Sequence, residues 1–100
     1  MTSSSRKTIN VKLLAGSASL VTRDQAKALH AQILADVDEF TTVTLDLSDV
    51  TAMSPSFADE LFGGLRRELD ADFQSSIKVR CPQSAWRHLI RAALAYHRRP

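Results

Sequence analysis

Hydrophobic and polar residues alternate along three stretches of the chain, which cover residues 8–14, 42–48 and 75–80. A period of two residues is typical of a strand that buries one face, so each stretch is predicted to be a strand. Gly16 predicts a turn, and residues 19–21 can add a short strand after it.

Two further stretches repeat their apolar residues with the period of an α-helix. The first helix is predicted to begin with a capping box formed by Thr22 and Gln25 and to end near Asp38. Its apolar face comprises Ala26, Leu29, Ile33, Val37 and, where the pattern continues, Phe40. The last helix is predicted to open at Pro82, with an apolar face of Trp86, Leu89, Ile90, Ala93 and Leu94.

Between the middle strand and the next helix lies a serine-rich bend, Ser54-Pro55-Ser56. Proline suits the first position of a helix because its missing N–H is not needed there, which favours Ser54 as the N-cap. Ser56 with Asp59 three residues later is an alternative capping box, and the sequence leaves both caps open. In either case two hydroxyls lie beside the positive end of a helix.

The helix after this bend has one apolar face and two glycines in its interior. The face comprises Phe57, Ala58, Leu61, Phe62, Leu65 and Leu69. Gly63 and Gly64 should weaken the helix by roughly 1 kcal/mol each relative to alanine. Such a pair allows close packing against a strand or a partner.

Strands and helices alternate along the chain, and this order predicts an α/β domain with a small mixed or parallel sheet and about three helices. One hundred residues are enough for one domain with a modest core. Residues 1–7 lack the apolar segment of a signal peptide, so we interpret them as a disordered lead or an expression remnant. The domain is expected to span residues 8–97.

The bend and its surroundings resemble the STAS-like superfamily, the fold of the anti-sigma-factor antagonists, and most of all a branch of uncharacterised bacterial proteins. The residues that carry the resemblance are Asp46-Leu47, Val50, Ser54-Pro55-Ser56-Phe57 and Asp59-Glu60-Leu61. A second matching segment is Leu20-Val21-Thr22-Arg23, followed by Ala26 and Leu29. The resemblance covers residues 8–95 and implies a single STAS-like domain.

The same resemblance implies a regulatory module that is not an enzyme and that binds a histidine-kinase-like ATPase or an anti-sigma factor. In the antagonists, the strand leads into Asp-Ser-Ser-Gly, whose first serine is phosphorylated by a partner kinase. Aligned without gaps, Ser54 replaces the aspartate, Pro55 falls on the phosphoacceptor, and Ser56 matches the second serine. The candidate phosphoacceptors here are therefore Ser56 and then Ser54.

Composition excludes several classes of function. The single cysteine, Cys81, excludes an internal disulfide and suits a reducing cytosol, and no apolar run approaches the ~18 residues of a membrane span. His30, His88 and His97 are widely spaced, with no acid or cysteine pattern that would make a metal site. No Gly-x-Ser-x-Gly elbow or glycine-rich phosphate loop is present, so we expect no catalytic residue and no cofactor. A hydrolase that uses Ser56 is the weakest hypothesis.

Charge is distributed unevenly along the chain. All eleven carboxylates lie between Asp24 and Asp72, and with three cations they give this span a formal charge of −8. Four cations precede it and six follow it. The pattern fits recognition by two oppositely charged faces, or a solvated surface with internal ion pairs. The alternative function is nucleic-acid binding through the basic C-terminal helix, because phosphate contacts need cations. The residues that indicate it are Arg87, His88, Arg91, His97, Arg98 and Arg99.

The candidate partner-binding residues are Asp46, Asp49, Ser54, Pro55, Ser56, Asp59, Glu60 and Arg23. Several of them also have a purely structural interpretation. The two serines can cap a helix, Asp46 can order the loop after its strand, and Arg23 can make a local contact near the first helix. Capping and phosphate binding are compatible, because both use the N–H groups of a helix start.

Overall fold

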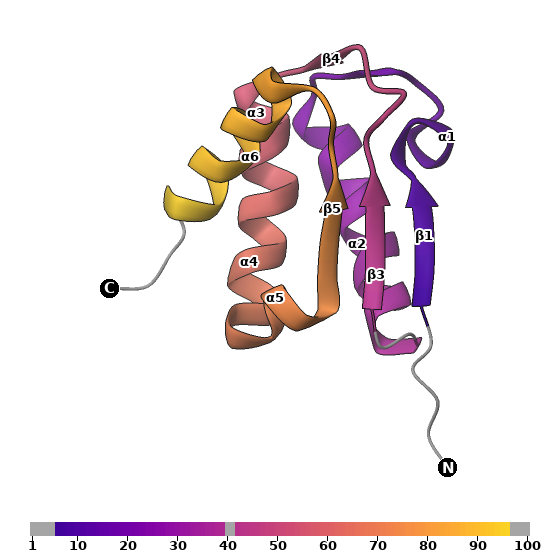
Figure 1. Cartoon of the computed structure of the whole chain (residues 1–100), viewed down its shortest axis with the longest axis vertical. Coiled ribbons are helices and arrows are strands. Elements are labelled where there is room, and N and C mark those ends of the chain that lie inside the picture. Colours follow the sequence, from indigo (N-terminus) through magenta and orange to yellow (C-terminus); the bar gives the residue numbers. More distant parts are fainter. Residues whose placement is uncertain (1–5, 40–41, 97–100) are drawn as a thin grey trace.

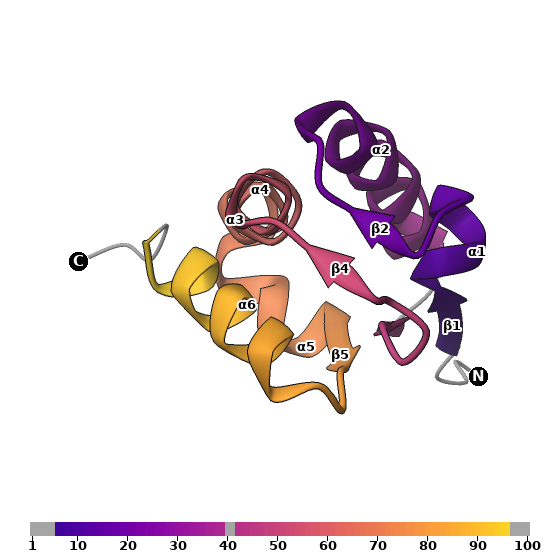
Figure 2. The ribbon, with the colours of Figure 1, turned by 90° about the horizontal axis from the view of Figure 1, so that it is seen from above.

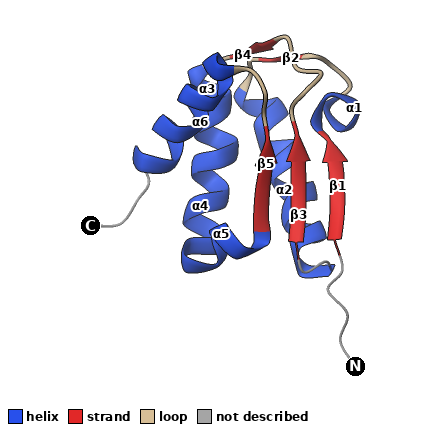
Figure 3. Ribbon diagram, viewed as in Figure 1, coloured by secondary structure: helices blue, strands red, loops and turns tan. Residues whose placement is uncertain are grey.

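A parallel three-stranded sheet forms one side of the molecule, and helices lie behind it and beyond one edge (Figure 1). The computed structural model describes residues 6–39 and 42–96. The sheet contains β1 (Arg6–Asn10), β3 (Thr42–Asp46) and β5 (Ile77–Arg80), in the spatial order β1-β3-β5. A separate parallel pair, β2 (Ser19–Leu20) and β4 (Ala52–Met53), lies above the carboxyl ends of these strands (Figure 3).

Two long helical segments run side by side behind the sheet, and a third helix lies beyond β5 (Figure 2). The first is α2 (Arg23–Glu39). The second comprises α3 (Pro55–Ala58), the π-helical segment η1 (Asp59–Gly63) and α4 (Gly64–Leu69). The third is α6 (Ser84–Tyr96). Short helical turns complete the chain: α1 (Val11–Ala15), η2 (Asp70–Asp72) and α5 (Phe73–Ser76).

The core lies between the sheet and these helices. The largest side chains with almost no exposed surface are Phe57, Phe62, Leu20, Ile33, Leu45, Leu47, Leu61, Leu65, Val11 and Val43. The predicted apolar faces of the first and second helices thus face the core, and Leu69 is partly buried at its margin. The α/β class with a small parallel sheet is confirmed.

One carboxylate is buried with these apolar side chains. Asp36 of α2 is 5% exposed, and its Oδ1 lies 3.2 Å from Nζ of Lys7 on β1. A buried charge without such a partner would be strongly unfavourable, so this pair ties α2 to the first strand.

The prediction of a single strand over residues 8–14 was wrong at both ends. The strand begins at Arg6, inside the range expected to be a disordered lead, and residues 1–5 of that lead lie outside the described residues. It ends at Asn10, whose side chain accepts a hydrogen bond from the N–H of Leu13 and caps α1. Gly16, at φ 73°, closes this turn of helix. Leu13 is consequently 75% exposed, although the alternation predicted a buried face.

The starts of the last strand and of the last helix also differ from the predictions. The last strand begins at Ile77, because residues 73–76 form a helical turn. The last helix begins at Ser84, so Pro82 precedes it and does not open it.

The capping box at the start of α2 is confirmed, with Gln25 N–H donating to Oγ1 of Thr22 and Thr22 N–H donating to Oε1 of Gln25. The predicted contribution of Phe40 lies outside the described residues.

None of the helices in the described part of the chain combines the length and the hydrophobicity that a membrane span requires.

Candidate functional site

The bend between β4 and α3 is held by Ser54. Its Oγ accepts a hydrogen bond from the N–H of Phe57 at 3.0 Å and donates one to the carbonyl oxygen of Val21 at 2.8 Å. Its N–H donates to the carbonyl oxygen of Leu20 at 3.0 Å. Ser54 is therefore the N-cap, with Pro55 at the first helical position, and the alternative cap formed by Ser56 and Asp59 was wrong. The capping hydroxyl also ties the bend to the start of α2.

The other two residues of the bend face solvent. Pro55 and Ser56 are both exposed at the start of α3. Within the described residues, the Ser56 hydroxyl makes no hydrogen bond, whereas the Ser54 hydroxyl both donates and accepts. Of the two candidate phosphoacceptors, Ser56 is thus the accessible one.

Arg23, at the first position of α2, crosses to the segment that follows the bend. Its Nη1 lies 3.1 Å from Oε1 of Glu60 and 3.5 Å from Oδ2 of Asp59. The three side chains are 52%, 23% and 38% exposed, respectively. Solvent weakens ion pairs with this exposure, so the cluster contributes little to the free energy of unfolding. It does orient three charges beside the bend.

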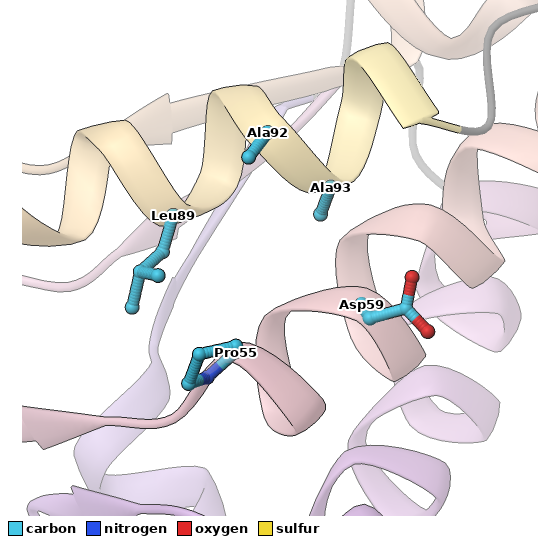
Figure 4. A pocket seen from close by; sticks show the side chains of 5 residues that line it. All are labelled: Pro55, Asp59, Leu89, Ala92 and Ala93. Atoms are coloured by element: carbon cyan, nitrogen blue, oxygen red, sulfur yellow. The ribbon is translucent and has the colours of Figure 1, made fainter.

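An open groove with a volume of about 380 Å³ runs between the bend and α6 (Figure 4). Its lining residues are Pro55, Asp59, Leu89, Ala92 and Ala93. The groove is mostly apolar, with the Asp59 carboxylate at one side. Leu89 and Ala93 were predicted as part of the apolar face of the last helix, and Ala92 was not. These α6 residues line a surface beside the bend only because α6 packs against η1, and the sequence does not indicate that packing.

Asp46 lies at the end of β3 and orders the loop that follows. Its Oδ1 accepts hydrogen bonds from the Ser48 hydroxyl at 2.6 Å and from the Ser48 N–H at 2.9 Å. These two bonds hold the pKa of Asp46 below its ordinary value, and the Arg80 guanidinium adds a smaller effect in the same direction. Asp46 therefore remains ionised and keeps the loop in place.

The same loop is fastened to its neighbours by three other side chains. Asp49 Oδ2 accepts a hydrogen bond from Nδ2 of Asn10 at 3.0 Å. Gln83 Nε2 donates to the carbonyl oxygens of Val50, Ser48 and Leu47 at 2.9, 3.1 and 3.3 Å. Trp86 Nε1 donates to the Val50 carbonyl oxygen at 3.3 Å. Gln83 was not predicted as a site residue, because nothing in its local sequence indicates hydrogen bonds to residues more than thirty positions away.

The structure thus divides the predicted site residues into two groups. Ser54, Ser56 and Pro55 form the bend, with Arg23, Asp59 and Glu60 beside them. Asp46 and Asp49 belong to the loop before β4, where they bond to Ser48 and Asn10.

The described residues offer no arrangement of metal ligands. Among them, no group of three or more histidine, cysteine, aspartate or glutamate side chains could hold a metal ion. Cys81 is a buried free thiol, and burial raises its pKa, which leaves less of the reactive thiolate.

A family model described as a STAS-like domain of unknown function matches residues 25–83. The chain belongs to this STAS-like family. The matched range begins inside α2 and contains β3, the bend, the second helical segment and β5. The segment Leu20-Val21-Thr22-Arg23, which also carried the resemblance, lies just before it. No curated protein and no solved structure matches the sequence.

Proposed function

We propose that this STAS-like domain is a regulatory module without enzymatic activity, and that it binds a protein partner through the surface around the bend. One observation carries the proposal. The Ser54 hydroxyl is used inside the fold, whereas Pro55 and Ser56 are exposed on a helix start that this hydroxyl holds rigid. A preorganised, exposed turn loses little conformational entropy when a partner binds it.

The surface around the bend has an apolar part and a charged part. The apolar part is Pro55 with the neighbouring groove on α6, which includes Leu89 and Ala92. The charged part is Arg23 with Asp59 and Glu60. An apolar centre with a polar rim is the usual composition of a protein–protein interface. By the family resemblance, the partner is a histidine-kinase-like ATPase or an anti-sigma factor in the cytoplasm.

Phosphorylation of Ser56 would change this surface electrostatically. A phosphate adds about −1.5 to −2 charges, and the N–H groups of a helix start favour a nearby anion. Asp59 lies one turn further along the same helix and would oppose the added charge. We infer that the unphosphorylated bend is the ordinary binding surface, and that phosphate on Ser56 would alter its affinity for the partner.

The test compares Ser56→Ala and Ser56→Asp for partner capture from lysate of the source cells. A switch at Ser56 predicts that the aspartate variant changes recovery of the partner while the alanine variant does not. If the bend binds the partner without acting as a switch, both Ser56 variants should recover the partner equally. Pro55→Glu, which puts a charge on the apolar part, should then recover less of the partner. If none of the three changes the set of recovered proteins, the bend is not the binding surface.

A further inference from the structure

Among the described residues, no strand pairs with the outer edge of β5. This strand lies at the end of the sheet, paired on one side with β3, and its register places Asp46 opposite Arg80 and Leu45 opposite Val79. In a parallel pair, alternate residues direct both main-chain groups to the neighbouring strand. The Arg80 carbonyl oxygen accepts a hydrogen bond from Leu47 N–H at 2.8 Å, so the main-chain N–H and C=O of Arg80 point to β3. By this alternation, the N–H and C=O of Val79 point away from the sheet.

A groove of about 200 Å³ lies along this edge, between β5 and α6. Figure 2 shows the α6 helix beyond the last strand. It is lined by Val79, Cys81, Arg87, Ile90, Arg91 and Leu94. The strand side is apolar, and Val79 is 36% exposed although Ile77, on the same face of the strand, is 3% exposed. A second opening, with a volume of about 310 Å³, continues past Arg91 and Leu94 towards Phe73.

The groove is positively charged. Arg87 and Arg91 lie one helical turn apart on α6, and both line it. Residues 73–96 contain four cations, Lys78, Arg80, Arg87 and Arg91, and no carboxylate. The charge therefore favours an acidic ligand, and the outer edge of β5 favours an extended one.

We propose that an extended acidic segment of a partner protein binds in this groove as an added strand on β5. In this arrangement, the segment forms main-chain hydrogen bonds with both the N–H and the C=O of Val79. Alternate apolar side chains enter the space between Val79 and Leu94, and acidic side chains meet Arg87 and Arg91. Strand addition between a sheet edge and a helix is a recurrent way to bind peptides, in which main-chain bonds give affinity and side-chain pockets give specificity.

This surface is separate from the bend, so the two proposals can fail independently. A phage-displayed library of random decapeptides is selected on the immobilised full chain, and the enriched peptides are synthesised for titration against the ¹⁵N-labelled protein. We expect sequences that alternate acidic and apolar residues, and chemical-shift changes centred on the Val79 amide. Ser56→Asp, a change at the bend, should leave the affinity unaltered.

Matched variants test the charge contacts and the main-chain pairing separately. Arg91→Glu should weaken binding about tenfold or more, whereas Lys78→Glu, the same charge change on the other face of β5, should alter the dissociation constant less than about threefold. Val79→Pro removes an N–H that β3 does not use and should abolish binding. Should that variant unfold, peptides with alternate amides N-methylated provide the same test, because they cannot donate to the edge.

Four outcomes would overturn the proposal. The library enriches no acidic peptide, or the shifts map to the bend or to the open face of the sheet. A duplex or single-stranded oligonucleotide moves the Val79 amide and displaces the peptide, in which case the surface binds nucleic acid. Without peptide, the protein dimerises and the β5 amide signals broaden with concentration, in which case the occupant is a second copy of the chain.

Discussion

Two serines, two residues apart, have different roles at the bend. Ser54 bonds to Val21 and Phe57, whereas Ser56 is exposed one position after Pro55. The sequence could not separate them, because each begins a plausible cap. The Ser54 cap is reinforced by the bond from its hydroxyl to the Val21 carbonyl oxygen, which joins residues thirty-three positions apart and which no local pattern contains.

The first prediction concerns these two hydroxyls. Ser54→Ala removes the N-cap bond and the bond to Val21, and it should lower the free energy of unfolding by about 0.5–2 kcal/mol. Ser56→Ala should change it by less than about 0.5 kcal/mol, because the exposed hydroxyl has no described partner. Urea denaturation of both variants checks the difference. Equal losses would contradict the assignment of the cap.

The second prediction concerns Asp46 and pH. Because its pKa is lower in the folded protein than in the unfolded chain, the ionised carboxylate stabilises the fold above the unfolded pKa of about 3.9. This contribution is lost as the pH falls through the folded pKa. The difference in unfolding free energy between wild type and Asp46→Asn should therefore be constant above about pH 5 and shrink below about pH 4.

Denaturation of both proteins across this pH range checks the effect. Ser48→Ala is the control, because it removes the hydroxyl donor to Asp46 and should reduce the pH-dependent part of the difference. A difference that stays constant down to pH 2 would show that the carboxylate charge plays no part.

At the scale of elements, periodicity predicted the long helices better than the short ones. The apolar repeat identified α2 and the segment from Pro55 to Leu69, because a long amphipathic face leaves little choice of period. It failed for α1, where one turn of helix is compatible with an alternating pattern and the Asn10 cap decides the outcome. The π-helical segment η1 was also unforeseen, because π-helical turns are rare and the four-residue spacing of Phe57, Leu61 and Leu65 is equally compatible with an α-helix.

The third prediction concerns Gly64. It has ordinary helical angles, with φ −62°, and a Cβ added there would meet the His30 ring at 3.5 Å, a normal contact distance. Gly64→Ala should therefore raise the free energy of unfolding by up to about 1 kcal/mol, through helix propensity. Gly64→Val, which adds bulk beside the same ring, should be destabilising. Thermal denaturation of the pair checks this, and a large loss with alanine would show that the helices approach too closely for any side chain.

At the scale of the molecule, the order of elements was enough to predict a small mixed or parallel sheet backed by helices, and the sheet is parallel. It did not predict that α6 would lie beyond β5 and form grooves with both the bend and the sheet edge. Those grooves depend on how α6 docks against η1, and packing angles between elements far apart in sequence leave no periodic signal. The separate segments that carry the site residues could therefore be predicted from the sequence. The surface that combines the bend with α6 could not be predicted.

The fourth prediction concerns the hydrophobic core between the sheet and the helices. Phe62 is completely buried between the helices and the sheet, and Phe62→Ala should lower the free energy of unfolding by roughly 3–5 kcal/mol. Leu13→Ala is the control, because Leu13 is 75% exposed and its truncation should have almost no effect. Comparable losses in the two variants would contradict the architecture.

The most direct test of the account places a photo-crosslinking residue at the bend in the source cells. Ser56→benzoylphenylalanine should give a covalent adduct with one partner protein after irradiation, because position 56 is exposed at the centre of the proposed interface. The same residue at Lys12, an exposed position on α1, should not give that adduct. Recovery of a single partner from position 56 alone is the result we predict. Adducts absent from position 56, or identical at both positions, would contradict the proposal that this STAS-like domain acts through its bend.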